Sequence, residues 1–356
     1  MLKLRRGVVA STDPLLVEVD GRERPAWADR SVVGEVEAGD EVIVNIEALD
    51  LGLGSGGFDI VHANLTRGLD RGDAEGEHVM KLNYTSLQHP VEPVERPVEA
   101  EGTARVPVLV LPLHGHLAPA AWSAAQARPG LRLGYVQSAG GALPGALSRD
   151  VAELRSRGLL SGHVTAGASY GGEGEAIGSL GALDAAGELG WDAVVAGAGP
   201  GIQGSETRYG HGGMAALDTA HAALALRMPT LVSPRLSAAD PRPRHRGLSH
   251  HTAAVLELLL APVRVPVPEV EASEWPTPEA ASASPGPEPG MLDELREACA
   301  DRHDLAVQPV DLAGYAASGL PTRTMGREIG EDPLFFAAAL ASGRALAAAV
   351  FERGGG

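Results

Sequence analysis

The segment VPVLVLPL, residues 106–113, is a continuous apolar run with the length of a single strand. Such a run is typical of a strand that is buried on both faces, as in a parallel sheet. Similar runs follow at residues 131–138, 162–170, 191–199 and 228–235, with Ala- and Leu-rich helical patterns between them. This alternation predicts an α/β fold with a mainly parallel, Rossmann-like sheet and helices on both faces.

The residues before this sheet have a different pattern. Short alternating runs are broken by Gly, Asp and Pro, and GEVEAGDEVIVN (residues 34–45) is typical of two strands joined by a tight turn. These features predict a small β-barrel of the SH3 or OB type. We therefore expect a barrel domain with a linker over residues 1–100. A second domain is expected over residues 101–356, with a Pro-rich insertion near residues 265–290.

Composition limits the class of protein. The chain of 356 residues has a formal net charge of -17, which argues against a nucleic-acid partner because such binding needs a basic face. A single cysteine, Cys299, excludes an intramolecular disulfide and a multi-thiolate metal site. The N-terminus lacks the apolar run of a signal sequence, and residues 256–268 are too short and too rich in proline to span a bilayer. We expect a cytoplasmic protein with no membrane partner.

Residues 235–252, RLSAADPRPRHRGLSHHT, concentrate positive charge in this acidic chain. They hold four arginines and three histidines but only one carboxylate, Asp240. Such a cluster repels itself unless an anion or carboxylates neutralise it. The segment leads into a helical pattern that Ser249 or Thr252 can cap, so the first helix amides would point at the cluster. This combination predicts an anion pocket, with phosphate as the expected anion.

A glycine-rich loop, AGAGPGIQGSETRYGHGG at residues 196–213, follows another predicted strand. Its amides and hydroxyls suit an anion, although the glycines serve a tight strand-to-helix turn equally well. The carboxyl ends of parallel strands meet at one edge, so this loop and the cationic segment should share a pocket. Arg323 and Arg327 are expected in a solvated loop, and they would reach the same ligand only if the last unit packs at that edge. The predicted ligand-binding residues are Gly199, Gly201, Gly204, Ser205, Thr207, Arg208, Arg235, Arg242, Arg244, His245, Arg246 and Ser249.

Histidines and carboxylates at this edge are the candidates for catalysis. Imidazole titrates near neutral pH, which suits a general acid or base, and a carboxylate can orient it. The predicted catalytic residues are His114, His116, His250, His251, Glu173 and Asp240. The expected function is hydrolysis or group transfer on a small phosphorylated or otherwise anionic metabolite, such as a nucleotide. No particular cofactor is implied.

Two alternatives remain open. In the first, the chain is a metallohydrolase that uses His114, His116 and His211. His250 and His251 are neighbours that should point in different directions on a helix, so we do not expect both to ligate one ion, and the main interpretation assigns no metal ligand. In the second, the chain is a non-catalytic assembly or regulatory module. The barrel would then mediate a homo-oligomer, and the arginines would pair with carboxylates of a neighbouring subunit.

Several longer phrases resemble a bacterial family known as domain of unknown function 3866 (DUF3866). They are GEVEAGDEVIVN, LPLHGHLAPAAW, LGYVQSAGGALPGALS, GASYGGEGEA, AGAGPGIQGSETRYG, RHRGLSHHT and TMGREIGEDPLFF. The resemblance extends over almost the whole chain. Because no activity is attached to the family, the resemblance implies no substrate, cofactor or catalytic residue.

Overall fold

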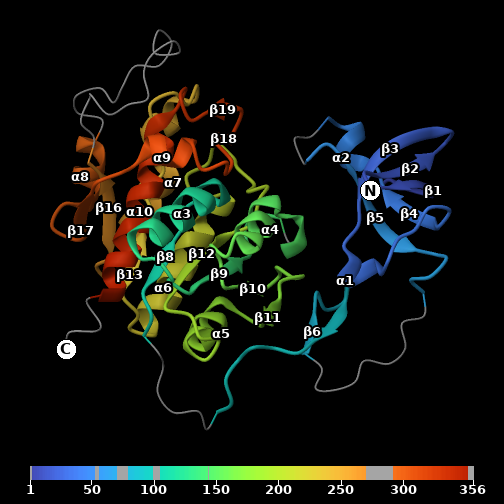
Figure 1. Ribbon diagram of the computed structural model, residues 1–356, viewed down its shortest axis with the longest axis horizontal. Coiled ribbons are helices and arrows are strands. Elements are labelled where there is room, and N and C mark those ends of the chain that lie inside the picture. Colours follow the sequence, from blue (N-terminus) through green and yellow to red (C-terminus); the bar gives the residue numbers. More distant parts are fainter. Residues whose placement is uncertain are drawn as a thin grey trace. The chain divides into compact units, whose positions relative to one another are not determined.

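The computed structural model divides the chain into two compact units, Met1–Glu92 and Pro93–Gly356, each of which is described by itself (Figure 1). The division, between residues 92 and 93, lies within residues 1–100, over which we expected the barrel domain and its linker. The structure describes residues 2–52, 56–69, 79–98, 105–142, 144–269 and 292–351.

The first unit contains a closed β-barrel with the strand order β1-β2-β3-β5-β4, as the sequence predicted. Its strands are β1 (Leu4–Thr12), β2 (Leu15–Val19), β3 (Arg22–Trp27), β4 (Glu41–Asn45) and β5 (Asp59–Asn64). Alternate residues face inward, as in any half-buried strand, and Val17, Val42 and Val44 are fully buried there. The other described elements are α1 (Arg30–Val33), α2 (Glu47–Asp50), β6 (Val79–Lys81) and β7 (His89–Val91).

One expected strand of the barrel is absent. The tight turn at Gly39 (φ +90°) and the strand after it are present, but residues 34–37 form no strand. The buried carboxylate of Asp40 accepts a hydrogen bond from the Glu37 amide at 2.9 Å and another from Asn64 at 2.8 Å. These bonds hold residues 34–37 as a loop, because their backbone groups turn to Asp40 and Asn64 rather than to a neighbouring strand.

The second unit is built on an eight-stranded sheet in which every strand pairing is parallel. This confirms the predicted α/β class. The strand order is β11-β10-β9-β12-β8-β13-β16-β17. The strands are β8 (Val108–Val110), β9 (Leu133–Ser138), β10 (Gly162–Ala166), β11 (Gly174–Ala176), β12 (Ala193–Ala198), β13 (Thr230–Val232), β16 (Arg264–Pro268) and β17 (Asp304–Gln308).

Helices cover both faces of this sheet (Figure 1). Val108 and Val110 of β8 belong to one apolar cluster, which includes residues of α5, α6, α7 and α8. Leu109 and Leu111, which point the other way, belong to a second cluster with α3, α4, α9 and most of α10. The helices are α3 (Leu117–Ala127), α4 (Arg149–Ser156), α5 (Ser179–Asp184), α6 (Ala215–Ala225), α7 (His250–Leu258), α8 (Asp293–Cys299), α9 (Leu312–Ala316) and α10 (Pro333–Phe351).

The sheet reverses its direction of growth between β8 and β12. From β8 the chain passes to β9, beyond β12, whereas from β12 it passes to β13, beyond β8 on the opposite side. At such a point the two connections leave the sheet edge in opposite directions and open a crevice outside the carboxyl ends of the strands. The fold therefore places a binding crevice at the loops that follow β8 and β12.

The strand β16 was missed in the sequence. Its residues, RVPVP, stand at the beginning of the segment expected as a Pro-rich insertion. Pro266 and Pro268 are tolerated because β16 pairs with β17 along its length but with β13 only at Arg264, so few ladder bonds are lost. The rest of the expected insertion, from residue 270 onward, lies outside the described residues.

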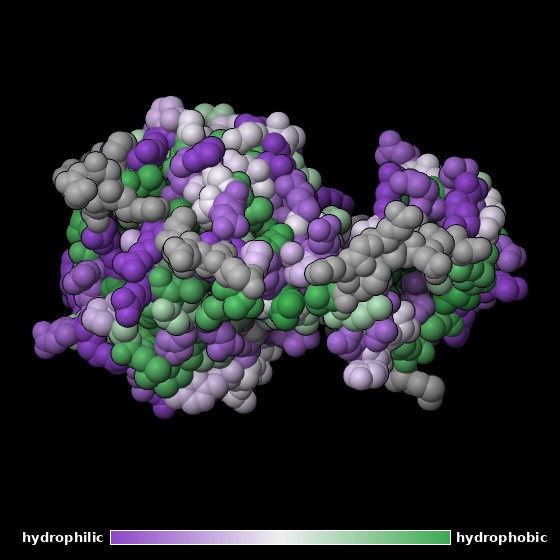
Figure 2. Space-filling view, turned by 90° about the horizontal axis from the view of Figure 1, so that it is seen from below, coloured by the Kyte–Doolittle hydropathy of each residue, from purple (hydrophilic) through white to green (hydrophobic). Residues whose placement is uncertain are grey.

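The helix α10 is the central core helix of the second unit. Its segment Pro333–Val350 is long and apolar enough to cross a membrane, but 83% of that segment is buried inside the unit. This is the burial of a core helix. On the face seen in Figure 2, hydrophilic and hydrophobic residues are interspersed over the described surface.

Close packing of α10 against α3 depends on Gly343. A Cβ atom added at Gly343 would lie 2.0 Å from the carbonyl oxygen of Ala120 in α3. We expect Gly343→Val to destabilise the unit by about 1–3 kcal/mol, because the helices must move apart. Urea denaturation would measure the change. Ala348→Val, at an exposed position of the same helix, is the matched control and should show only the small helix-propensity effect. Equal losses for the two variants would contradict the packing argument.

Candidate functional site

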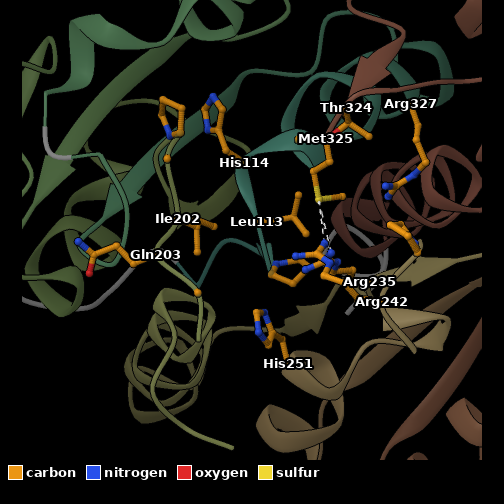
Figure 3. A pocket seen from close by; sticks show the side chains of 16 residues that line it. Leu113, His114, Ile202, Gln203, Arg235, Arg242, His251, Thr324, Met325 and Arg327 are labelled. Atoms are coloured by element: carbon orange, nitrogen blue, oxygen red, sulfur yellow. Dashed lines mark hydrogen bonds between the residues drawn. The ribbon is translucent and has the colours of Figure 1, made fainter. Parts of the chain in front are cut away.

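A cavity of about 580 Å³ lies at the crevice predicted by the sheet topology (Figure 3). Its size is within the range of small-molecule sites. The cavity is lined by residues 112–115 after β8, residues 200–204 after β12, Arg235, Pro241 and Arg242 after β13, His251 of α7, and Thr324, Met325 and Arg327. The last three belong to the hairpin of β18 (Arg323–Thr324) and β19 (Arg327–Glu328). Loops that are far apart in the sequence thus meet in one cavity.

Three arginines converge on a single buried carboxylate at this cavity. Asp240 is fully buried, and its Oδ2 accepts hydrogen bonds from Arg242 at 2.8 Å, Arg235 at 3.1 Å and Arg327 at 3.4 Å. Figure 3 shows the guanidinium groups of Arg235 and Arg242 together, with Met325 on one side and His251 on the other. Asp240 therefore anchors the cationic wall of the cavity.

The carboxylate Asp332 is a second anchor of this wall. Its side chain accepts hydrogen bonds from Arg327 at 3.1 Å, from the Ser237 hydroxyl at 2.6 Å and from the Ala238 amide at 3.0 Å. Its bonds to Ser237, in the short strand β14 (Leu236–Ser237), tie the hairpin to the segment after β13. Arg327, but not the exposed Arg323, lines the cavity.

The charges of this wall are strongly coupled. Burial alone would raise the pKa of Asp240, but hydrogen bonds from Arg242 and the charges of Arg242 and Arg235 outweigh burial and hold that pKa well below its usual range. Burial lowers the pKa of Arg235 to about 10, against the opposing effect of Asp240. At neutral pH all of these groups are charged, so Asp240 is a fixed anion rather than a proton donor or acceptor.

The glycine-rich loop contributes only part of its length to the cavity. Gly201 and Gly204 line it, and Gly201 has a φ of +77° that favours glycine. Gly199 is instead a packing residue, since an added Cβ would lie 2.5 Å from Gln137. Ser205 and Thr207 hydrogen-bond to each other at 2.7 Å, and Ser205 also donates to the Gly210 carbonyl at 2.5 Å. These hydroxyls stabilise the loop itself.

Several predicted ligand-binding residues lie outside the cavity lining. Arg208 forms an ion pair with Glu257, and Arg244 forms one with Glu206 at 3.3 Å. Arg246 is exposed. Ser249 caps α7 as predicted, accepting a hydrogen bond from the His251 amide at 3.3 Å. Residue His245 is buried, with Nδ1 2.7 Å from the Ser249 hydroxyl.

The predicted catalytic residues fall into different places. His114 lines the cavity, with Nε2 2.7 Å from the Ser148 hydroxyl and Nδ1 3.3 Å from the Tyr135 hydroxyl. His116 is fully buried behind it, 2.9 Å from Ser233. The two histidines do not continue a strand but form one short 3₁₀ turn, His114–His116. Glu173 does not line the cavity and pairs with Arg155 at 2.6 Å.

Low basicity limits what these two histidines do. Burial, with a smaller contribution from His163, lowers the pKa of His114 to about 4. Burial, with repulsion from Arg235, lowers the pKa of His116 to about 3. Both imidazoles are therefore neutral at neutral pH and act there as hydrogen-bonding groups.

Beside the cavity, four histidine rings lie against one another. The rings of His211 and His251 are stacked with centroids 3.5 Å apart, and the rings of His250 and His251 are 4.3 Å apart. His245 lies 4.8 Å from His251 and 4.9 Å from His250. We expected the adjacent His250 and His251 to diverge. They approach because α7 begins at His250, whose ring turns back so that Nδ1 lies 3.3 Å from the Arg244 carbonyl.

Among the described residues, His211, His250 and His251 form the only group of three that could hold a metal ion. One ring nitrogen of each lies within 4.8 Å of the others. His114 and His116 are not part of it, so the set His114, His116 and His211 is not brought together as the metallohydrolase alternative required. The sequence contained all three residues of the cluster, but only the tertiary structure shows that they meet.

The fold and the cavity define a Rossmann-like α/β protein with a ligand-sized site at the carboxyl edge of its sheet. Residues 25–343, nearly the whole chain, match a family described as Protein of unknown function (DUF3866). The chain belongs to this family. No curated protein and no solved structure is significantly similar to it.

Proposed function

We propose that the cavity binds a small anionic metabolite, such as a nucleotide or another phosphorylated compound, and that the protein acts on it by hydrolysis or group transfer. The observation that carries this proposal is Arg235. Its side chain is only 6% exposed, it lines the cavity, and its Nε has no hydrogen-bond partner among the residues that the structure describes. A buried guanidinium with an unused donor is stabilised by an anion that accepts from it.

The charge balance of the wall supports the same ligand. Arg235, Arg242 and Arg327 carry three positive charges, and the two buried carboxylates that they contact, Asp240 and Asp332, neutralise two of them. The remaining positive charge faces the cavity. Coulomb attraction for an anion is stronger there than at the surface, because nearby protein excludes water.

The opposite wall suits the uncharged part of such a metabolite. Leu113 and Ile202 present apolar side chains to the cavity, while the loop of Gly201 and Gly204 brings backbone close to it (Figure 3). The Thr324 side chain, from the β18–β19 hairpin, also lines the cavity. A pocket that is largely apolar with a few convergent polar groups is the usual form of a small-molecule site.

Binding of phosphate compounds should depend on Arg242. We expect some nucleotides or sugar phosphates to raise the melting temperature of the wild type, and Arg242→Ala to abolish this shift. A ligand at a hundred times its Kd stabilises by about 2.7 kcal/mol, which corresponds to roughly 5–10 °C for a domain of this size. A thermal-shift screen with inorganic phosphate, nucleotides and sugar phosphates would measure it.

Arg323→Ala is the control for the loss of one positive charge. It removes an exposed arginine that lies near the cavity in sequence but does not line it, so the shift should persist. The proposal fails if no phosphorylated compound stabilises the wild type, or if Arg242→Ala and Arg323→Ala respond to the ligand equally.

A further inference from the structure

We propose that His211, His250 and His251 form a binding site for a single divalent transition-metal ion of the zinc type. The site goes beyond the proposed function, because it rests on the three histidines alone and does not require an anion in the cavity. Each of the three rings has one buried nitrogen without a hydrogen-bond partner among the described residues, namely Nδ1 of His211, Nε2 of His250 and Nε2 of His251.

The hydrogen bonds of two rings determine which nitrogen is free. Nε2 of His211 lies 3.1 Å from the Arg208 carbonyl, and Nδ1 of His250 lies 3.3 Å from the Arg244 carbonyl. A carbonyl oxygen only accepts, so these nitrogens carry the hydrogen. The opposite nitrogens, Nδ1 of His211 and Nε2 of His250, therefore present lone pairs. Histidine ligands of metal ions usually have this arrangement, in which the other ring nitrogen donates to a backbone carbonyl.

Burial makes free lone pairs at this place costly. His211 and His251 are each only 7% exposed, and a buried polar atom without a hydrogen-bond partner is destabilising. One ring nitrogen of each of the three histidines lies within 4.8 Å of those of the other two, so a single metal ion can be reached by all three rings. Gly213 leaves space beside the rings, since a Cβ added there would lie 3.0 Å from Nδ1 of His211.

The donor set selects the ion. Neutral imidazole favours Zn²⁺, Co²⁺, Ni²⁺ and Cu²⁺ over Mg²⁺ and Ca²⁺, which prefer oxygen. Nitrogens bound to one tetrahedral Zn²⁺ at about 2.0–2.1 Å lie roughly 3.3 Å apart. The rings must draw together slightly, and His211 and His251 must tilt out of their stack.

Three protein ligands leave one position of a tetrahedral ion open. His251 also lines the cavity, so an ion bound to it would lie beside the anion pocket. Sites with three protein ligands and an open position are typical of catalytic rather than structural zinc. A metal ion held there supplies a Lewis acid beside Arg235 and Arg242.

The test uses the full chain, stripped of metal with a chelator and dialysed. Isothermal titration calorimetry should show one Zn²⁺ per chain with micromolar or tighter affinity, and Co²⁺ should give the intense visible absorption of a four-coordinate ion. His250→Ala and His211→Ala should each weaken Zn²⁺ binding at least about a hundredfold, since even the loss of a group that supports a ligand costs 10–100-fold. His221→Ala, at a half-buried histidine of α6, should leave binding unchanged.

The proposal is overturned if the wild type binds no Zn²⁺, or if folded His250→Ala binds Zn²⁺ as tightly as the wild type. Far-UV circular dichroism of the metal-free variants establishes that they are folded. Should both variants unfold, the Co²⁺ spectrum of the wild type decides, because weak octahedral bands would contradict the four-coordinate site that we propose. Retained phosphate binding in His250→Ala would separate this failure from a failure of the anion pocket.

Discussion

Replacing Asp240 with alanine is expected to destabilise the second unit by about 3–5 kcal/mol. Asp240 is fully buried and neutralises part of the charge on Arg235, Arg242 and Arg327. Removal of one member of a buried ion pair leaves uncompensated charge in a medium of low polarity, which is far more costly than the loss of a surface pair. Urea denaturation of the wild type and the variant would measure the loss.

Two further variants separate the causes of this effect. Asp240→Asn keeps the shape but removes the charge, and its amide nitrogen cannot accept the hydrogen bonds that one carboxylate oxygen accepts from the arginines, so it should still lose much of the stability. Glu206→Ala removes an exposed carboxylate from Arg244 and should change stability little. If Asp240→Ala proves no more destabilising than Glu206→Ala, Asp240 is not the electrostatic anchor of the cavity.

The Asp240 carboxylate should stabilise the fold but weaken the binding of an anion. Without the Asp240 carboxylate, three guanidinium groups face the cavity with only Asp332 to neutralise them. An anion would then replace the missing charge, so phosphate should stabilise Asp240→Ala more than it stabilises the wild type. This dependence links the stability of the fold to the proposed ligand.

The class of the fold could be predicted because the burial of a strand determines which of its residues are apolar. Strands such as β8 and β12 are buried on both faces and so are apolar at every position. The strand β16 was not predicted, because Pro266 and Pro268 are typical of loops. A strand is possible there because β16 pairs along its length only with β17. Residues 34–37 were wrongly predicted as a strand, because their apolar and polar residues alternate. In the structure the Asp40 carboxylate holds them in a loop.

The cavity could be located but not described in detail. Strands that end at a common edge bring their loops together, and one pocket was therefore expected there from the sequence. The cavity at this edge is lined by residues from these loops, among them Arg235, Gly201, His114 and His251. Which polar group binds which neighbour depends on distances that no sequence pattern encodes. The pairing of Arg244 with Glu206 is one such detail. The meeting of His211 with His250 and His251 is another.

Acidification from neutral pH to about pH 4 is expected to destabilise the second unit steeply. Burial lowers the pKa of His114 and His163 to about 4 and that of His116 to about 3. In the unfolded chain a histidine has a pKa near 6.5 and binds a proton first, so the unfolded state takes up more protons as the pH falls. The stability is fully present above about pH 6.5 and is lost progressively between that pH and about pH 4.

The size of the loss and its origin can be checked together. Each such histidine contributes at most about 1.4 kcal/mol per pH unit to the slope. Urea denaturation at several pH values would measure the slope. His116→Gln removes one of these contributions and should lower the slope by up to that amount. The contribution of the Asp240 carboxylate to stability is lost only at a still lower pH, because the pKa of this group lies below its usual value of 3.8. A stability that is flat between pH 7 and pH 5 would contradict the assignment of these histidines as buried and neutral.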